Sequence, residues 1–159
     1  MYKILEIIEK NCRLTEEQLA VMTGKTREEV RGSIKNYEND GVILAYNTLI
    51  DWDKAGKDTV TALIEVKVTP QRGEGFDKTA ERIARYPQVK GCYLMSGGFD
   101  LTVIIEGRTM KEVALFVAEK LATLDSVLST ATHFVLKKYK DKGIIFGKKP
   151  EDDREAIIL

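Results

Sequence analysis

The stretch YLMSGGFDLTVIIE, residues 93–106, holds the turn around which most of the chain is arranged. Two apolar runs meet there at Gly97 and Gly98, and a Gly-Gly pair between such runs predicts a β-hairpin. Strand and helix patterns flank this hairpin in mirrored order: a strand over 59–69, a helix over 75–86, a helix over 110–124 and a strand over 127–138. The sequence therefore predicts a βαββαβ unit with the hairpin at its centre.

The alternation of residues along the predicted strands indicates which face of the sheet is buried. Every second residue from Val60 to Val68 is apolar and both helices carry apolar stripes, so the helices should cover one face of a ferredoxin-like sheet. A second apolar set is expected on the opposite face: Leu63, Cys92, Leu94, Ile104 and Val135. Because a bare apolar face is unfavourable in water, this set predicts homodimerisation through the sheets. The alternative is a bulge that changes the direction of these side chains.

The first 46 residues follow a helical period instead, beginning with an amphipathic helix over 2–10. Two further helices are delimited by capping boxes and by terminating glycines: Thr15 with Gln18, Thr26 with Glu29, Gly24 and Gly41. Two capped helices joined by a short turn, with a third helix before them, predict a helix-turn-helix. The apolar run over 41–46 predicts a strand or wing that packs back on these helices.

A basic stripe lies on the last of these helices. Arg27, Arg31 and Lys35 are spaced i, i+4 and i+8, displaced from the apolar face, so they could face a DNA duplex. The chain carries 25 basic and 25 acidic residues, so any contact with nucleic acid must come from a local patch of this kind. The candidate DNA contacts are Lys25, Thr26, Arg27, Arg31, Ser33 and Lys35. The alternative is an ordinary solvated face, which Glu28 and Glu29 would favour.

These patterns predict four segments, namely a winged helix-turn-helix over 1–46, a linker over 47–58, a βαββαβ domain over 59–139 and a C-terminal tail over 140–159. Trp52 is expected to anchor the linker against a domain. The run Gly143 to Gly147 could add an edge strand to the sheet. The fold class is therefore α+β, with two small modules.

The sequence gives no support for a secreted or membrane protein, a metal site or an enzyme. The start of the chain does not resemble a signal peptide and no apolar run approaches the roughly 18 residues of a membrane span, so a cytoplasmic protein is expected. Cys12 and Cys92 lie in different modules without further ligands nearby, which predicts reduced thiols and no metal site. His133 is the only histidine and has no catalytic partners by motif, so we expect neither an enzyme nor a cofactor.

Two groups of residues carry a resemblance to a known family. The run Leu14 to Ala20, followed by Val30, Ile34 and Tyr37 through Ile43, resembles the N-terminal half of the Lrp/AsnC, or feast/famine, transcription regulators. The turn Met95 to Leu101, followed by the strand pattern over 127–137, is similar to the paired motif of that family's effector and assembly domain. The resemblance implies a winged helix and a βαββαβ domain that dimerises, with dimers assembling into rings, as an octamer, around an amino-acid site.

The hairpin turn offers the groups that a free amino acid requires. Gly97 and Gly98 leave backbone N–H groups unhindered for a carboxylate, Asp100 can pair with an ammonium group, and Thr130 and Thr132 would add hydroxyls if their strand ends nearby. At the position of Gly98 the family often has Asp or Glu. The alternative is a tight turn in which the aspartate only caps backbone amides.

The sequence thus favours a DNA-binding transcriptional regulator that responds to an amino acid or a related small metabolite. Its partners would be double-stranded DNA, the effector and further copies of the chain. One alternative is a ligand-binding assembly protein whose DNA-binding domain has degenerated, because Ser33 and Asn36 stand where the family tends to have basic residues. A ferredoxin-like metabolite-binding or enzymatic domain would account for the second module alone.

Overall fold

The computed structural model describes residues 2–70 and 75–147. The chain divides into two compact units, Met1–Leu49 and Ile50–Leu159. The division falls inside the segment 47–58 that the sequence predicts as a linker, so the second part of that segment belongs to the C-terminal unit. There Lys57 Nζ lies 4.4 Å from the centroid of the Trp52 ring, a cation–π contact within that segment.

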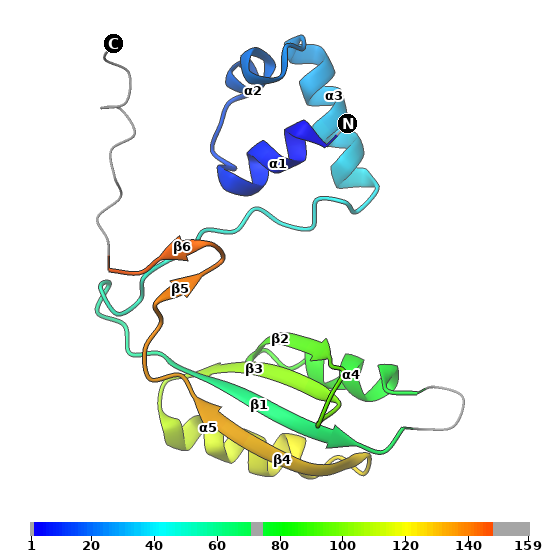
Figure 1. The fold of residues 1–159 in the computed structure, drawn as a ribbon, viewed down its shortest axis with the longest axis vertical. Coiled ribbons are helices and arrows are strands. Elements are labelled where there is room, and N and C mark those ends of the chain that lie inside the picture. The colour runs from blue at the N-terminus through cyan, green and yellow to red at the C-terminus, as the bar shows by residue number, and fades with distance from the viewer. Residues whose placement is uncertain (1, 71–74, 148–159) are drawn as a thin grey trace. The chain divides into compact units, whose positions relative to one another are not determined.

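The N-terminal unit contains three helices, α1 (Lys3–Lys10), α2 (Glu16–Thr23) and α3 (Arg27–Asn39), as shown in Figure 1. Both predicted capping boxes are confirmed, since the Thr15 and Thr26 side chains each accept from the backbone N–H three residues later, and each threonine donates its own N–H to the side chain of that later residue. Gly24 ends α2 in the left-handed conformation, with φ of 68°. One buried side chain from each helix, Ile4, Leu19 and Val30, forms the centre of this unit.

The strand predicted over 41–46 is not formed in the part of the chain that the structure describes. Instead, the N–H groups of Val42 and Ile43 both donate to the carbonyl of Tyr37, and the Tyr46 hydroxyl donates to Glu38 Oε1 at 2.8 Å. A strand requires a neighbouring strand for its hydrogen bonds, and the described part of this unit supplies none. The segment therefore turns back at Gly41 and then continues without regular secondary structure, with Leu44 almost fully exposed.

The C-terminal unit has the predicted βαββαβ order. Its elements are β1 (Val60–Val68), α4 (Asp77–Ala84), β2 (Val89–Leu94), β3 (Leu101–Gly107), α5 (Met110–Phe116) continued by the π-helical turn η1 (Val117–Leu121), and β4 (Val127–Phe134). The four strands pair antiparallel in the order β2-β3-β1-β4, which confirms the ferredoxin-like sheet (Figure 1). β4 ends at Phe134, which pairs with Ala62, rather than near Lys138, because β1 begins at Val60 and so gives the residues up to Lys138 no strand to pair with.

The last described segment forms a small separate hairpin rather than an edge strand of the main sheet. Its strands are β5 (Lys140–Asp141) and β6 (Ile144–Ile145), which pair only with each other. The sequence predicts an added edge strand over 143–147. A strand does form there, but the prediction that it joins the main sheet is wrong. Residues 148–159, the remainder of the predicted tail, lie outside the described residues.

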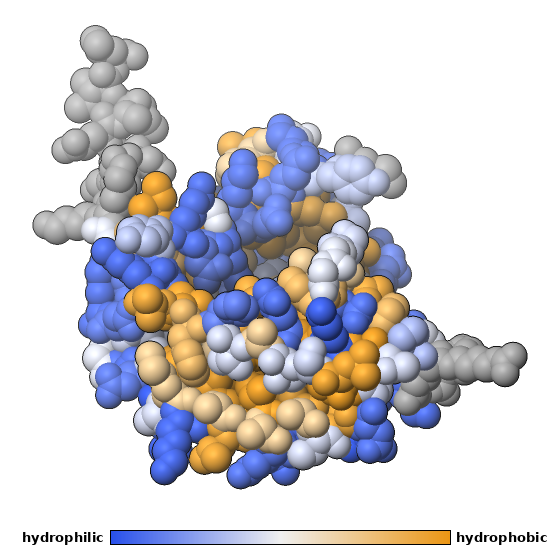
Figure 2. Space-filling view, turned by 60° about the horizontal axis from the view of Figure 1, so that its bottom comes forward, coloured by the Kyte–Doolittle hydropathy of each residue, from blue (hydrophilic) through white to orange (hydrophobic). Residues whose placement is uncertain are grey.

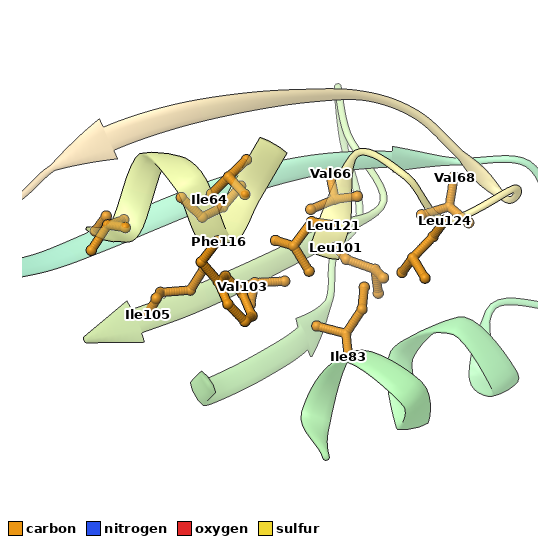
Figure 3. Close-up of a cluster of buried hydrophobic side chains, with 13 residues drawn as sticks. Ile64, Val66, Val68, Ile83, Leu101, Val103, Ile105, Phe116, Leu121 and Leu124 are labelled. Carbon is orange, nitrogen blue, oxygen red and sulfur yellow. The ribbon is translucent and has the colours of Figure 1, made fainter. Parts of the chain in front are cut away.

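The core of the C-terminal unit lies between the sheet and its two helices. Figure 3 shows the alternate residues of β1 and β3 directed toward α4 and α5, as the alternation predicts: Ile64, Val66, Val68, Leu101, Val103 and Ile105. Ile83 of α4 and Phe116 of α5 pack against them from the helical side. Every one of these side chains is buried, so the helices cover the central strands β1 and β3 on this face of the sheet.

The opposite face of the sheet is less apolar than the sequence predicts. Leu63 pairs with Ile104 on that face, as expected, and the backbone bond from Val135 to Thr61 places Val135 there too. The prediction is wrong for Cys92 and Leu94. They pair with Val103 and Leu101 and therefore lie on the helix-covered side of the sheet. The reason is a register shift between Val89 and Gly91, which puts Gly91 rather than Cys92 opposite Ile104.

Both cysteines are free, as predicted. The Cys92 thiol lies 3.8 Å from the carbonyl oxygen of Ala80 in α4, and its burial raises its pKa, whereas Cys12 is exposed. Apolar residues also reach the molecular surface in several patches between charged ones, as Figure 2 shows. These include side chains on three elements that the sequence analysis did not single out: Met110 and Leu115 of α5, Leu128 of β4 and Tyr93 of β2.

Candidate functional site

The first candidate surface is the outer side of α3. Arg27, Arg31 and Lys35 are all exposed, while Val30, on the inward side of the same helix, is completely buried. The predicted stripe therefore exists and is accessible. Among the described residues, Lys35 enters no salt bridge, so its charge is free for a partner.

The two arginines of this stripe are held by an acid of the preceding helix. Arg31 binds the carboxylate of Glu16 side-on, with Nε 2.9 Å from Oε1 and Nη2 2.7 Å from Oε2. Arg27 Nε lies 3.0 Å from the same Oε2, and Arg27 Nη1 lies 2.8 Å from Glu17 Oε1. The two guanidinium groups lower the pKa of Glu16 to about 2, Arg31 contributing more than Arg27.

Glu16 is the residue that the sequence analysis missed. The sequence shows it only as one of two acids in the first turn of α2, a position that already favours a carboxylate because of the helix dipole. The spacing of Arg27 and Arg31, one helical turn apart, is visible in the sequence. That both face the start of α2 depends on the packing of α2 against α3, which no local pattern records.

The hydroxyl groups among the candidate DNA contacts are already engaged within the helix. Thr26 Oγ1 accepts from the Glu29 N–H and donates to Glu29 Oε2, the latter at 3.0 Å. Ser33 Oγ donates to the carbonyl of Glu29 at 2.8 Å. Lys25 is exposed just before α3 begins. The cations are thus more available to a partner than the hydroxyls are.

The second candidate surface is the turn between β2 and β3. Asp100 joins this turn to β1, because its Oδ2 accepts from the Val68 N–H at 2.8 Å and its own N–H donates to the Val66 carbonyl at 3.1 Å. Gly97 and Gly98 are exposed, and a Cβ added to either would meet no other atom within 4 Å. Gly97 has φ of 138°, a conformation that other residues rarely adopt. One carboxylate oxygen of Asp100, Oδ2, therefore caps a backbone amide, as the alternative interpretation of this turn predicts.

Thr130 and Thr132 lie on β4, across β1 from the turn. Thr130 pairs with Val66, which also receives the Asp100 bond on its other side, so Thr130 is level with the turn. Thr132 pairs with Ile64, one pair of residues farther along β1. Two strand spacings separate the turn from Thr130, which is roughly 10 Å. The structure therefore brings Gly97, Gly98 and Asp100 together, but within one chain it does not bring the threonines into contact with them.

Comparison with known proteins identifies both units. The Lrp/AsnC ligand binding domain matches residues 61–145, and a winged helix-turn-helix DNA-binding domain matches residues 1–43. The HTH-type transcriptional regulator YugG of Bacillus subtilis, itself uncharacterised, is 50% identical over 157 residues, which cover 98% of this chain and 94% of the relative. The chain belongs to the Lrp/AsnC family.

One further relative and two solved structures are similar to this chain over most of its length. The proline dehydrogenase transcriptional activator of Rhizobium radiobacter is 25% identical over 142 residues, 89% of this chain and 90% of that protein. The crystal structure of MtbAldR has a TM-score of 0.75 at 22% identity, covering 93% of this chain and 96% of its own. The Neisseria meningitidis regulator NMB0573, solved as a complex with L-Met, has a TM-score of 0.71 at 23% identity, covering 87% and 89%.

As a member of the Lrp/AsnC family, the chain is a transcriptional regulator with a DNA-binding unit and a unit that binds a small-molecule effector, and it is not an enzyme. No group of three or more His, Cys, Asp or Glu side chains that could hold a metal ion occurs among residues 2–70 and 75–147. Over the same residues, no helix is both long enough and apolar enough to cross a bilayer.

His133 has a more exposed place than the sequence suggests. Its Nε2 lies 3.3 Å from Glu65 Oε1, and more than half of the imidazole side chain is exposed. It pairs with Leu63 and therefore belongs to the face of the sheet that carries no helix. In the described residues, the acid paired with His133 is Glu65.

The ion pairs of Glu16 predict a specific dependence of stability on pH. Because the pKa of Glu16 is lowered to about 2 in the folded protein, its contribution is fully present above its ordinary pKa of 4.5 and is lost as pH falls from about 4.5 to about 2. Glu16→Gln should therefore lower the free energy of unfolding at pH 7, and the difference from wild type should shrink by pH 2.5. Denaturant unfolding of the N-terminal unit, followed by far-ultraviolet circular dichroism, measures this.

The matched control is Glu28→Gln, a change of the same charge on α3 at a residue that makes no salt bridge in the described part of the chain. It should change stability by no more than about 0.5 kcal/mol at either pH. Equal losses of stability for Glu16→Gln at both pH values would contradict the assignment of its stabilising role to the ion pairs.

Proposed function

We propose that this regulator contacts DNA through the cations of α3 and binds an amino acid or similar zwitterion at the turn between β2 and β3. The observation that carries the effector proposal is the composition of that turn, where exposed N–H groups of Gly97 and Gly98 lie beside a carboxylate. The second oxygen of Asp100, Oδ1, accepts no hydrogen bond from the residues that the structure describes, so it is available to an ammonium group. The L-Met complex of the Neisseria relative supports an amino acid as the ligand class.

The assembly proposal rests on the sheet face that no helix covers. Leu63, Ile104 and Val135 lie on it, together with the pair formed by Glu65 and His133. We expect two copies of this face to meet in a homodimer, since removing apolar area from water is favourable by roughly 25 cal/mol per Å2. By family resemblance, dimers would assemble further, up to an octamer.

The separation of the threonines from the turn bears on where the effector would bind. Thr130 and Thr132 lie on the far side of β1 from Asp100, so a ligand that contacts both groups would do so only where two chains meet. Ligand binding would then bias assembly rather than contact DNA directly, and couplings of about 1–3 kcal/mol are typical of such linkage.

The DNA proposal predicts a change in the salt dependence of binding. Lys35→Ala should weaken binding to a duplex selected from a random pool by the wild-type protein, because it removes an unpaired cation from α3. If Lys35 contacts a phosphate, the slope of log K against log salt should fall in magnitude by about one. Filter binding or fluorescence anisotropy at several salt concentrations gives the slope. Lys111→Ala, which removes the same charge from α5, is the control, and an equal change in both variants would argue against α3.

The effector proposal predicts that charge, rather than shape, is needed at Asp100. Asp100→Asn keeps an oxygen that can accept from the Val68 N–H, so folding should be nearly unchanged, but it removes the negative charge that pairs with an ammonium group. Titration calorimetry against the twenty amino acids should detect at least one ligand for the wild type and at least about tenfold weaker binding for the variant. Asp125→Asn in a neighbouring loop is the control. Unchanged affinity in Asp100→Asn would move the site elsewhere.

The assembly proposal predicts that a charge on the open sheet face separates the subunits. Ile104→Lys should dissociate the dimer, because an unpaired charge in an apolar interface costs several kcal/mol. Leu115→Lys, at a half-exposed position on α5 behind the sheet, should leave the assembly intact. Sedimentation of the full chain at micromolar concentration measures the oligomeric state of the wild type and of both variants. A monomeric wild type under those conditions would contradict the proposal.

A further inference from the structure

The contact between Glu16 and Arg31 uses one edge of the guanidinium group and leaves the other free. Arg31 binds through Nε and Nη2, which form the side-on edge, with donor–acceptor distances of 2.9 and 2.7 Å. A guanidinium group has five N–H donors, so the outer edge formed by Nη1 and the second hydrogen of Nη2 stays complete. With 58% of its side chain exposed, Arg31 can present that edge to a partner.

Arg27 is held differently, although it also contacts Glu16. Its Nε is directed to Glu16 Oε2 at 3.0 Å and its Nη1 to Glu17 Oε1 at 2.8 Å. Arg27 is thus shared between two carboxylates that lie on two sides of its guanidinium group. Arg31 instead engages a single carboxylate, through its side-on edge alone.

We infer that Glu16 is a positioning residue for DNA sequence recognition, which holds Arg31 so that its free outer edge reads a base pair in the major groove. A bidentate fork of two N–H donors matches the O6 and N7 acceptors of guanine. The inference rests on the proposed placement of α3 against DNA and deepens it by assigning different roles to Arg31 and Lys35.

The rigidity of Glu16 itself supports this role. It is the first residue of α2, directly after the Thr15 cap, whose N–H donates to Gln18 Oε1 at 2.9 Å and whose hydroxyl accepts from the Gln18 N–H at 3.3 Å. The start of α2 is therefore fixed where the carboxylate must be held. A long arginine side chain that is already restrained on folding loses less conformational freedom when it binds a base.

The charge of the pair indicates that its effect should fall on discrimination between sequences. A guanidinium bound to a carboxylate is close to neutral, so Arg31 contributes little to the release of counterions that drives general binding to DNA. Contacts to base edges carry sequence information, whereas contacts to phosphates carry almost none. Arg31 is thus expected to affect the ratio of specific to non-specific affinity more than the non-specific affinity itself.

The experiment uses the full chain and a duplex selected from a random pool by the wild-type protein. Dissociation constants are measured at one salt concentration for that duplex, for versions with each base pair replaced in turn, and for an unrelated duplex. The variants are Arg31→Ala, Glu16→Gln, Glu16→Asp, Glu17→Gln and the double variant Arg31→Ala with Glu16→Gln. Circular dichroism establishes that each is folded, and Glu16→Asp keeps the charge while shortening the side chain.

Arg31→Ala should lose the preference at one base-pair position in each half-site. Glu16→Gln and Glu16→Asp should each reduce the preference at that same position by about fivefold or more, the lower end of what a bidentate contact contributes. Glu17→Gln removes an equal charge from the same helical turn but does not touch Arg31, so it should leave the preference unchanged. In the Arg31→Ala background, Glu16→Gln should have no further effect on it.

Three outcomes overturn the inference. Full discrimination in both Glu16 variants, combined with its loss in Arg31→Ala, would make Glu16 only a link between α2 and α3. If Glu17→Gln lost as much of the base-pair preference as Glu16→Gln, the effect would come from the loss of a negative charge and not from the placement of Arg31 by Glu16. No change in Arg31→Ala would remove Arg31 from base recognition, and if Lys35→Ala also left binding unchanged, the proposed DNA surface itself would fail.

Discussion

The pairing of β1 with two neighbours is the constraint on which the C-terminal unit depends. β1 forms backbone ladders with β3 on one side and β4 on the other, so each of its side chains has a determined direction and a determined partner. Its alternate residues supply the centre of the core, and Asp100 joins the hairpin turn to Val66 and Val68 near its end. Its position in the middle of the sheet also separates that turn from Thr130. Within one chain, the turn and the threonines of β4 therefore do not come into contact.

Asp100 combines a structural contact with a carboxylate oxygen that accepts no hydrogen bond from the described residues. One carboxylate oxygen completes a backbone hydrogen bond that the edge of the turn would otherwise leave without a partner. The other oxygen keeps a negative charge at the surface, beside two glycines that leave the backbone uncovered. Within the turn from Met95 to Asp100, Asp100 supplies the acidic side chain.

The N-terminal unit reconciles DNA binding with a chain whose charges balance. Two of the three stripe cations are paired with Glu16 and Glu17, so the exposed side of α3 carries less net charge than its sequence suggests. Such a surface relies less on general attraction to phosphates and more on directed hydrogen bonds. The ion pairs still leave both arginines accessible to a partner, since at least half of each side chain is exposed. Discrimination between DNA sequences, rather than tight binding to any DNA, is the property that this arrangement favours.

The sequence by itself determined the order of the elements, the helix ends and the buried face of the sheet, because these follow from local rules. Capping boxes at Thr15 and Thr26, the glycine stops and the alternation in β1 each depend on residues only a few positions apart. The tertiary structure decided what depends on register and on packing between distant segments. A shift of one residue in β2 turned Cys92 and Leu94 toward the helix-covered side, and among the described residues 41–46 have no neighbouring strand and so no regular structure. The partners of Arg27 and Arg31 were likewise set by the packing of α2 on α3, because an ion pair between two helices depends on distances in space that no spacing along one helix records.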